Sequence, residues 1–386
     1  MNRREVKKAP VLRFKGFTND WEQRKFENLV SRLSKTSNNE SLPNVTYDDI
    51  KSRENSLNKD ITELTHGKKG IHFNKDDILF GKLRPYLGNI LLARFNGIAV
   101  GDFWVLSPKD NNISSFLFDL IQTSKYKYIS NLSSGSKMPR SDWNLVSKAS
   151  FWVPIQQEQN KIGKIFQLID NLVSLQQRKL SLIKTLKRSF LSDLFFKTST
   201  NSIVITLKQV TSIRGGYAFK SKEFTENGYP IIKIANISNN GEIKGPYSYT
   251  NNFNKKYILT KNDIVLAMSG ATTGKIAKLR SSKSFLQNQR IGYFCKTNNI
   301  DYNYLYYLLI SDQFKKQLKR ITIAGAQPNV SSLDIENFRF SVLSSKNKQK
   351  KISDFLNKLD IKIRITNKKI TIFSQLKRSL LNNMFI

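Results

Sequence analysis

A long segment of this chain occurs twice, and the duplication constrains the fold more than any other feature of the sequence. Residues 159–195 match residues 349–385 at 11 of 37 aligned positions, with a constant offset of 190. The identities include Asp170 with Asp360. A period near half the chain length indicates two copies of one unit rather than a solenoid, whose repeats are much shorter. The sequence therefore predicts two equivalent halves related by a pseudo-two-fold axis.

Both copies have the pattern of long amphipathic helices. Apolar residues recur at heptad spacing and predict a broad apolar seam along each helix. In the first copy the seam holds Ile162, Ile169, Gln176, Ile183 and Phe190 at position a, Ile165 and Leu172 at d, and Phe166, Val173 and Leu180 at e. In the second copy it holds Ile352, Leu359, Thr366, Phe373 and Leu380 at a, Phe355 at d, and Leu356, Ile363 and Ile370 at e.

A two-fold axis across these helices reverses their direction, so we expect them to pair antiparallel. A helix of about 37 residues extends roughly 55 Å, which is comparable to about 16 base pairs of duplex DNA. The pair would then act as a ruler between the two halves. An ordinary coiled-coil dimerisation element is the alternative interpretation of the heptads alone.

The stretches outside the helices have a different composition. Residues 1–150 and 198–340 mix short β-type runs with turns rich in Gly, Asn and Ser, which predicts two globular domains. Residues 151–197 and 341–386 are expected to be the long helices that separate them. The predicted fold class is therefore α+β, with two globular domains, an antiparallel pair of long helices and an internal pseudo-two-fold repeat.

The two globular domains share only sparse anchors. Asp77 and Asp263 each precede a β-type run, and Gly88 and Gly274 each follow eleven positions later. Outside such anchors the two sequences diverge. A shared framework with divergent sequences is expected when two modules have the same architecture but bind different ligands.

The charge of the chain identifies the kind of partner. It has 64 Lys and Arg against 29 Asp and Glu, a net charge of +35 and a pI near 10.1. A polyanion is the expected partner, and binding should weaken steeply with salt because phosphate contacts release counterions. A basic ribosomal or membrane-surface protein is the alternative that charge alone leaves open.

Other features limit the environment of the protein. The single cysteine, Cys295, excludes internal disulfides and is typical of a reducing compartment. No apolar run is long enough to span a membrane, and the first residues lack the apolar core of a signal peptide. We therefore expect a cytoplasmic protein without a membrane partner.

Several segments, in this order, resemble the specificity subunit of Type I restriction-modification systems over essentially the whole chain. They are the run from Gly16 to Arg24, Asp77-Ile78-Leu79, Asp263-Ile264-Val265, and the run from Val153 to Ile162. The run from Val342 to Gln349 departs from the pattern, because it lacks the Val-Pro and Glu-Gln found before the first helix.

The resemblance implies a non-catalytic reader of double-stranded DNA with two target recognition domains. Proteins of this kind bind a bipartite sequence with an unread gap. They recruit two methylation (M) subunits and motor-nuclease (R) subunits. The resemblance also implies that S-adenosylmethionine, ATP and magnesium are used by those partners, and no cofactor is expected in this chain.

Basic and amide side chains in loops are the candidates for DNA contact, because Arg and Lys suit guanine edges and Asn and Gln suit adenine edges. Candidates for base contact in the first domain are Lys82, Arg84, Tyr86, Lys137 and Arg140. Those in the second domain are Lys275, Arg290, Gln327 and Asn329. Candidates for backbone contact are Lys68, Lys69, Lys278, Arg280, Lys319 and Arg320. For each residue alone, a solvated surface charge remains the alternative.

The sequence offers no catalytic residue and no metal site. The run from Gly270 to Lys275 is one residue short of a Walker loop, and Ile276 replaces the required Ser or Thr. Two histidines and one cysteine do not make a zinc site. Two alternatives stay open: a self-contained nuclease or methyltransferase, and an architectural basic coiled-coil protein that binds nucleic acid without sequence preference.

Overall fold

The chain folds into two compact units, and each unit contains one part of each long helix. The computed structural model describes residues 9–132, 138–196, 202–322 and 329–386. One unit comprises residues 1–178 and 366–386, and the other comprises residues 179–365. The first helix, α4, spans Gln156–Phe196, and the second, α8, spans Lys346–Asn383.

The N-terminal unit holds two four-stranded sheets. The first has the order β2-β11-β8-β9, with strands Val30–Leu33, Phe103–Pro108, Ile78–Gly81 and Ile90–Leu92. The second has the order β3-β7-β10-β4, with strands Thr36–Ser37, Gly70–Phe73, Gly97–Ala99 and Asn44–Val45. Smaller elements complete the unit: the paired strands β1 (Glu22–Lys25) and β12 (Ser150–Val153), the hairpin of β5 (Ile50–Lys51) and β6 (Ser56–Leu57), and helices α1 (Ser114–Leu120), α2 (Ser124–Ser130) and α3 (Trp143–Lys148).

The C-terminal unit repeats this plan. Its first sheet has the order β14-β21-β18-β19, with strands Ile213–Arg214, Ile291–Phe294, Ile264–Ala267 and Ile276–Lys278. Its second sheet has the order β16-β15-β20-β17, with strands Ser248–Thr250, Tyr229–Ile232, Phe285–Gln287 and Ile258–Leu259. The remaining elements are the paired strands β13 (Ser202–Thr206) and β22 (Arg339–Leu343), and helices α5 (Tyr302–Leu309), α6 (Asp312–Thr322) and α7 (Ser332–Glu336).

The first sheets of the two units are equivalent strand for strand, whereas the second sheets carry their extra strand on opposite edges. A parallel pair lies inside each second sheet, β4 with β10 in one unit and β15 with β20 in the other. The extra edge strand joins β7 in the N-terminal unit but β15 in the C-terminal unit. The strand orders of the two units therefore agree with the prediction of a shared framework that differs in detail between the domains.

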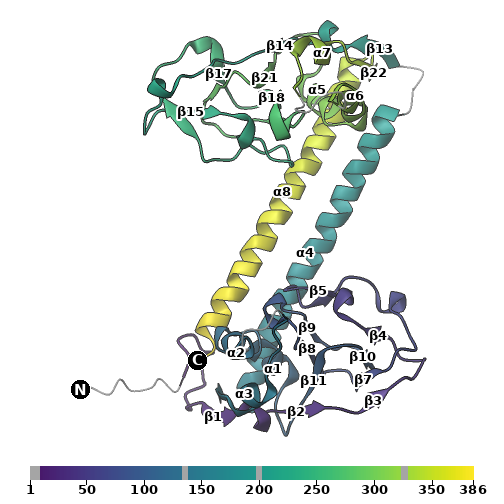
Figure 1. The fold of residues 1–386 in the computed structure, drawn as a ribbon, viewed down its shortest axis with the longest axis vertical. Coiled ribbons are helices and arrows are strands. Elements are labelled where there is room, and N and C mark those ends of the chain that lie inside the picture. Colours follow the sequence, from purple (N-terminus) through teal and green to yellow (C-terminus); the bar gives the residue numbers. More distant parts are fainter. Residues whose placement is uncertain (1–8, 133–137, 197–201, 323–328) are drawn as a thin grey trace. The chain divides into compact units, whose positions relative to one another are not determined.

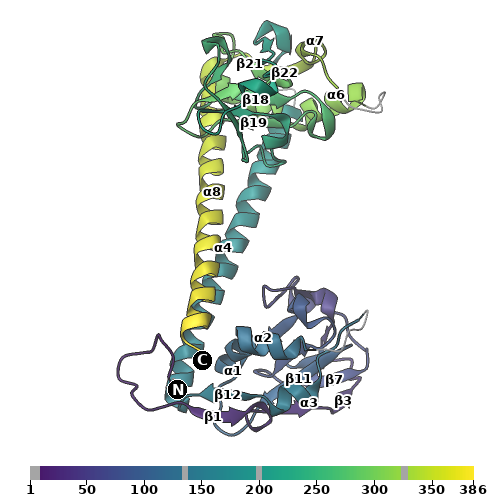
Figure 2. The same cartoon turned by 60° about the vertical axis from the view of Figure 1, so that its left-hand side comes forward.

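Within the N-terminal unit, the first half of α4 pairs with the last half of α8. Lys377 Nζ of α8 lies 2.7 Å from Asp170 Oδ1 of α4, and the Phe385 ring lies 6.1 Å from the Phe166 ring. Moving forward along α4 therefore means moving backward along α8, so the helices are antiparallel. Figure 1 shows α8 in yellow beside α4 in teal, and Figure 2 shows the same pairing from another direction.

Within the C-terminal unit, the last half of α4 pairs with the first half of α8, and the two helices are again antiparallel. Lys187 Nζ of α4 lies 2.5 Å from Asp360 Oδ1 of α8, and the Phe190 ring lies 5.0 Å from the Phe355 ring. The antiparallel arrangement predicted from the repeat is confirmed in both units.

The seam of each helix is made mainly by heptad positions a and e. Ile162, Phe166 and Ile169 are buried on α4, and Leu356 and Leu359 are buried on α8. The d positions are less buried, and Leu172 and Phe355 are each 40% exposed, although the Phe355 ring contacts the Phe190 ring. The expected period is therefore right, but the apolar seam is narrower on its d side than the heptads suggest.

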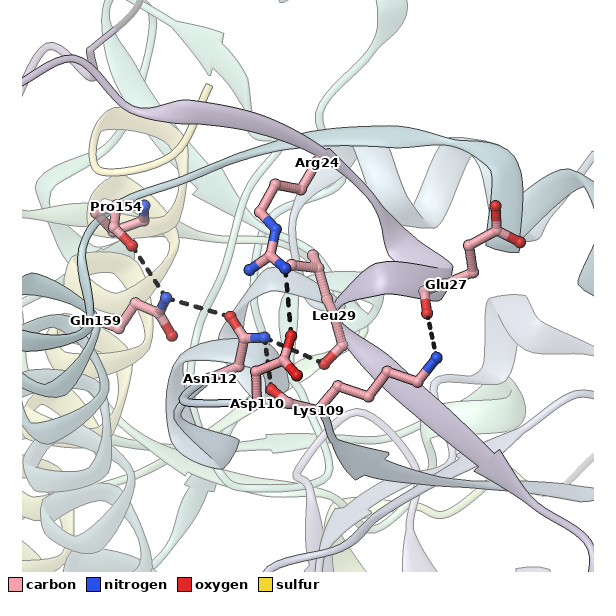
Figure 3. A network of polar contacts seen from close by, with 8 residues as sticks. All are labelled: Arg24, Glu27, Leu29, Lys109, Asp110, Asn112, Pro154 and Gln159. Carbon is pink, nitrogen blue, oxygen red and sulfur yellow. Dashed lines mark hydrogen bonds and ion pairs between the residues drawn. The ribbon is translucent and has the colours of Figure 1, made fainter.

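A buried glutamine joins α4 to the sheet domain of its unit (Figure 3). The Gln159 side-chain amide donates to Pro154 O at 3.0 Å and to Asn112 Oδ1 at 3.3 Å, and its oxygen accepts from Ile113 N at 3.0 Å. Asn112 in turn donates to Lys109 O at 2.7 Å in the loop after β11. Because the side chain is buried, these bonds fix the direction in which the helix leaves the domain.

The matching position of the repeat makes the same junction in the C-terminal unit. The Gln349 oxygen accepts from Asp301 N at 2.9 Å, and its amide donates to Leu343 O at 2.7 Å. Asp301 also caps α5, because its carboxylate accepts from Tyr304 N at 2.8 Å. The repeated glutamine thus docks each long helix onto its own domain.

The last residues of the chain belong to the core of the N-terminal unit. Phe385 is buried and stacks on Phe116 at 5.4 Å, while the Trp21 ring meets its edge at 6.4 Å. The Leu12 amide donates to Asn383 O at 2.9 Å, so the first described segment also runs beside the end of α8. The segment around Leu12 and the residues after α8 therefore belong to one unit.

Candidate nucleic-acid interface

Predicted contact residues of the N-terminal domain meet at the end of strand β8. Lys82 follows β8 directly, and Arg84 and Tyr86 lie in the turn after it. Arg140 comes from a distant segment that pairs with this turn, where the Arg84 amide donates to Pro139 O at 2.8 Å. Arg140 and Tyr86 are exposed, whereas Lys82 and Arg84 are half-buried. We call Lys82, Arg84, Tyr86 and Arg140 the N-terminal reading loop.

A carboxylate lies between two cations of this loop. Lys82 Nζ is 3.5 Å from Asp102 Oδ1, and Arg140 Nη2 is 3.1 Å from Asp102 Oδ2. Asp102 stands just before strand β11, and its side chain is 30% exposed. One negative charge therefore holds two positive side chains at a surface where DNA contact is predicted.

The backbone of Asp102 is fixed by a half-buried tyrosine, Tyr47. The Tyr47 hydroxyl donates to Asp102 O at 2.6 Å and accepts from Leu83 N at 3.0 Å. The Tyr47 ring also meets the Phe103 ring edge at 4.6 Å. Burial raises the pKa of Tyr47 to about 12, so its hydroxyl remains a donor at physiological pH.

The C-terminal domain repeats the same backbone crossing with other side chains. Lys82 N donates to Asp102 O at 2.9 Å, and Met268 N correspondingly donates to Arg290 O at 3.0 Å. Ser141 N donates to Lys82 O at 2.9 Å, and Val330 N correspondingly donates to Met268 O at 3.0 Å. These bonds place Met268, Arg290 and Asn329 where the N-terminal domain has Lys82, Asp102 and Arg140. Arg290 and Asn329 are both exposed, as their predicted role requires.

Two further predicted residues line a groove in the C-terminal unit. Lys275 and Arg280 border a groove of about 460 Å³ whose wall also includes Lys187 and Asp360. Arg280 Nη2 lies 3.7 Å from Asp360 Oδ2. The glycine before Lys275, Gly274, has a φ of +83° that an L side chain would adopt only with strain, so the tight turn depends on glycine.

The predicted phosphate contact at Lys278 does not suit the structure. Its side chain is buried, its Nζ donates to Asn303 Oδ1, and it lies 5.5 Å from the Tyr306 ring centroid. Burial lowers the pKa of Lys278 to about 8. In a strongly basic chain a lysine is expected at the surface, but strand β19 turns the Lys278 side chain inward. We therefore leave Lys278 out of the proposed interface.

The other predicted contacts lie apart in sequence from the N-terminal reading loop and from its C-terminal counterpart, Met268, Arg290 and Asn329. The exposed ones are Lys68 and Lys69, which precede β7, and Lys319 and Arg320, which lie near the end of α6. Lys137 and Gln327 lie outside the described residues.

Asp102 is the residue that sequence reasoning missed. An acidic residue is not expected at a DNA contact, because a polyanion repels it. One signal could have revealed it: Asp102 stands directly before the strand β11, as the predicted contact Arg290 stands directly before β21. Aligning the two domains on these strands brings the positions together.

The side chains gathered here are hydrogen-bond donors and acceptors rather than a catalytic set. Arg, Lys, Asn and Asp side chains can all reach base edges, and tyrosine adds a ring for contact. Among the residues that the structure describes, no group of three or more His, Cys, Asp or Glu could hold a metal ion. None of the described helices is both long and apolar enough to cross a bilayer.

A duplicated α+β fold that carries a differently charged loop on each copy defines a nucleic-acid-binding protein with two recognition domains. The model of the Type I restriction modification DNA specificity domain matches residues 18–185 and again residues 201–372. The chain belongs to this family, and the two matches follow the duplication seen in the sequence.

Known proteins agree with this assignment. The chain is 27% identical over 340 residues to the Type I restriction enzyme MjaVIII specificity subunit of Methanocaldococcus jannaschii, covering 81% of this chain and 79% of that protein. Its fold is similar to the crystal structure of a Type I restriction-modification S subunit from M. genitalium, with a TM-score of 0.70, 16% identity and coverage of 98% and 99% of the two chains. A chain from a study of complex assembly and conformational transition of the type I R-M system has a TM-score of 0.52 and 14% identity, with coverage of 94% and 96%.

Proposed function

We propose that this chain is the DNA-sequence-specificity subunit of a Type I restriction-modification complex and reads a bipartite target on double-stranded DNA. One observation carries the proposal: the same backbone crossing presents Lys82, Asp102 and Arg140 in one domain but Met268, Arg290 and Asn329 in the other. Two readers with different donors and acceptors prefer different base pairs. The target therefore consists of two unlike short words, with an unread gap between them.

The charge of the chain supports DNA as the ligand. A net charge of +35 supplies the sequence-independent attraction to phosphate, and the reading loops then discriminate between base pairs. We assign target recognition to residues 1–150 and 198–340 and the spacer to the two long helices. Exposed Lys68, Lys69, Lys319 and Arg320 are the proposed phosphate contacts.

Exposed apolar side chains on the long helices support the recruitment of partner subunits. Leu175 and Leu182 on α4 are 60% and 63% exposed, and their counterparts in the repeat, Ile365 and Ile372 on α8, are 52% and 49% exposed. Isolated apolar residues are common on protein surfaces, but heptad-spaced exposed ones mark a docking stripe for another helix. Because the stripe occurs on both copies, we propose that two methylation subunits bind. Motor-nuclease subunits complete the restriction complex.

We propose that the chain itself is not catalytic. The methylation subunits would use S-adenosylmethionine, and the motor-nuclease subunits would use ATP and magnesium. Purified chain incubated alone with DNA and either S-adenosylmethionine or magnesium should then show no turnover. Methylation or cleavage under these conditions would favour the enzyme alternative.

Selection from a library of random duplexes tests the main proposal. The full chain, assembled with its methylation subunits, should enrich two short words at one constant spacing. Binding without any enriched sequence, with an equally steep dependence on salt, would favour the architectural alternative instead. A single contiguous word would contradict the assignment of one reader to each domain.

A further inference from the structure

The strand-end position held by Asp102 in one domain and Arg290 in the other carries an inference about specificity, which rests on the proposed function. In both domains this residue directly precedes a strand, β11 or β21, and its carbonyl accepts a hydrogen bond from the amide of the residue that directly follows the neighbouring strand, at 2.9 and 3.0 Å. The backbone at the two sites is therefore superposable in its hydrogen bonding. Only the side chain differs, from an anion to a cation.

An acidic side chain at this place needs a specific reason. The chain is strongly basic, and a carboxylate close to DNA phosphates lowers affinity. Asp102 is not a loosely held surface group, because Tyr47 fixes its backbone at 2.6 Å and its side chain meets two cations. A rigid carboxylate between the Lys82 and Arg140 side chains lowers the non-specific attraction of that patch to DNA. It also restricts the rotamers of both cations.

We propose that Asp102 is a positioning residue that sets the base preference of the N-terminal domain by aligning Arg140 and Lys82 with base edges. Arg140 Nη2 lies 3.1 Å from Asp102 Oδ2, so one edge of the guanidinium is held and the other edge is left to face the DNA. A held guanidinium loses less side-chain entropy when it binds a guanine edge. Because Asp102 partly neutralises the same cations, they bind phosphate less well. The domain therefore discriminates better between sequences, while its sequence-independent affinity for DNA is lower.

Arg290 reads base edges directly in the C-terminal domain. Its side chain is exposed and forms no ion pair with the residues that the structure describes. Its neighbours in the crossing, Met268 and Asn329, are uncharged, so no acid holds it. The N-terminal word therefore depends on an acid-held arginine, and the C-terminal word depends on a free one.

The chain supplies a matched control for the acid. Asp110 follows β11 at the opposite end from Asp102, about 20 Å away for a strand of this length. Its side chain is 70% exposed and lies 3.4 Å from Arg24. Asp110→Asn therefore makes the same change of charge and residue type in the same domain, but outside the reading loop.

The test uses random-duplex selection with the full chain and its methylation subunits, comparing wild type, Asp102→Asn, Asp110→Asn and Arg290→Gln. Asp102→Asn should relax one or two base positions of one word by about tenfold and leave the other word unchanged. Arg290→Gln should relax only the other word, and Asp110→Asn should change neither. Asp102→Asn should also steepen the dependence of log K on log salt for non-specific DNA by about one unit, since the released cations reach phosphate.

Failure of this inference is distinguishable from failure of the proposed function. If wild type enriches two words and Asp102→Asn retains both without relaxation, Asp102 is not a specificity residue, although the two-part reading stands. If Asp102→Asn weakens both words equally and lowers the thermal midpoint, its role is structural and the inference is wrong. If wild type enriches no two-part sequence, both proposals fall together.

Discussion

Lys377 on α8 donates to both carboxylate oxygens of Asp170 on α4, at 2.7 and 2.8 Å. The repeat places Lys187 at the position of Lys377 and Asp360 at the position of Asp170, and these two residues meet at 2.5 Å in the other unit. Each unit therefore contains the same ion pair with the two helices exchanged. This exchange is what two copies of one unit, each with an antiparallel helix pair, produce.

Removing this ion pair should destabilise the unit that contains it. The Lys377 and Lys187 side chains are only 13% and 17% exposed, so Asp170→Asn or Asp360→Asn leaves a largely buried lysine with a weaker partner. We expect a loss of about 1–2 kcal/mol in the free energy of unfolding for either variant. Urea unfolding measures it, and the double exchange Asp170→Lys with Lys377→Asp should recover part of the loss. No recovery would mean that the pairing is incidental.

Asp119 should make the stability of the N-terminal unit depend on pH. It stands on α1 where Tyr307 stands on α5, and its buried carboxylate accepts one long hydrogen bond, from Gln122 Nε2 at 3.4 Å, whereas the Tyr307 hydroxyl bonds to Asp360 at 2.9 Å. Burial, together with nearby Asp170, raises the pKa of Asp119 well above 3.8. The unfolded chain therefore loses this proton at lower pH than the folded chain does.

This difference in proton binding determines how the stability of the folded unit changes with pH. As pH rises above about 4, the unfolded state ionises first, so folded stability declines until the folded carboxyl ionises as well. Asp119→Asn removes the decline, because the amide stays neutral. Its thermal midpoint should match wild type below pH 4 and exceed it near neutral pH. Parallel midpoint curves for the two proteins across the whole range would contradict the burial argument.

The end of the chain should be needed for the stability of the N-terminal unit. Phe385 packs on Phe116 and Trp21 within the core of that unit. Phe385→Ala should cost about 3–4 kcal/mol, because it leaves a cavity among aromatic rings. The exposed Asn382 is the control, and Asn382→Ala should change the free energy of unfolding by less than about 0.5 kcal/mol. Equal effects of the two substitutions would show that the terminus is not part of the core.

Charges on the exposed helix stripes should block partner binding without unfolding the chain. Leu175→Glu and Ile365→Glu replace equivalent residues that are 60% and 52% exposed. Each variant should retain the thermal midpoint of wild type and should lose one of the two proposed methylation subunits. The mass of the assembled complex reports this directly. Loss of both subunits from one variant, or of neither from the double variant, would exclude two equivalent docking stripes.

Much of the framework was predictable from the sequence because its signals are local. The heptads predicted both long helices and their inward a positions, and the repeat predicted their antiparallel sense. The partial exposure of Leu172 and Phe355 was not predictable, because a straight α-helix drifts against a strict seven-residue period. The order of the strands was not predictable either, since pairing between distant strands leaves no local pattern.

The candidate interface was predictable only in part. Lys82, Arg84 and Arg140 were selected for their residue type, and the fold brings them into one loop. Lys278 meets the same criterion but is buried, because residue type does not reveal that a strand turns its side chain inward. Asp102 was missed for the converse reason, since its role depends on two cations that are distant in the sequence.

The central claim is that one repeated framework holds two dissimilar DNA readers. Mapping of methylated adenine in DNA from cells that express this chain with its methylation subunits tests it most directly. The account predicts a split motif made of two unlike short words at one fixed spacing. A contiguous motif, or two identical words in inverted order, would contradict it.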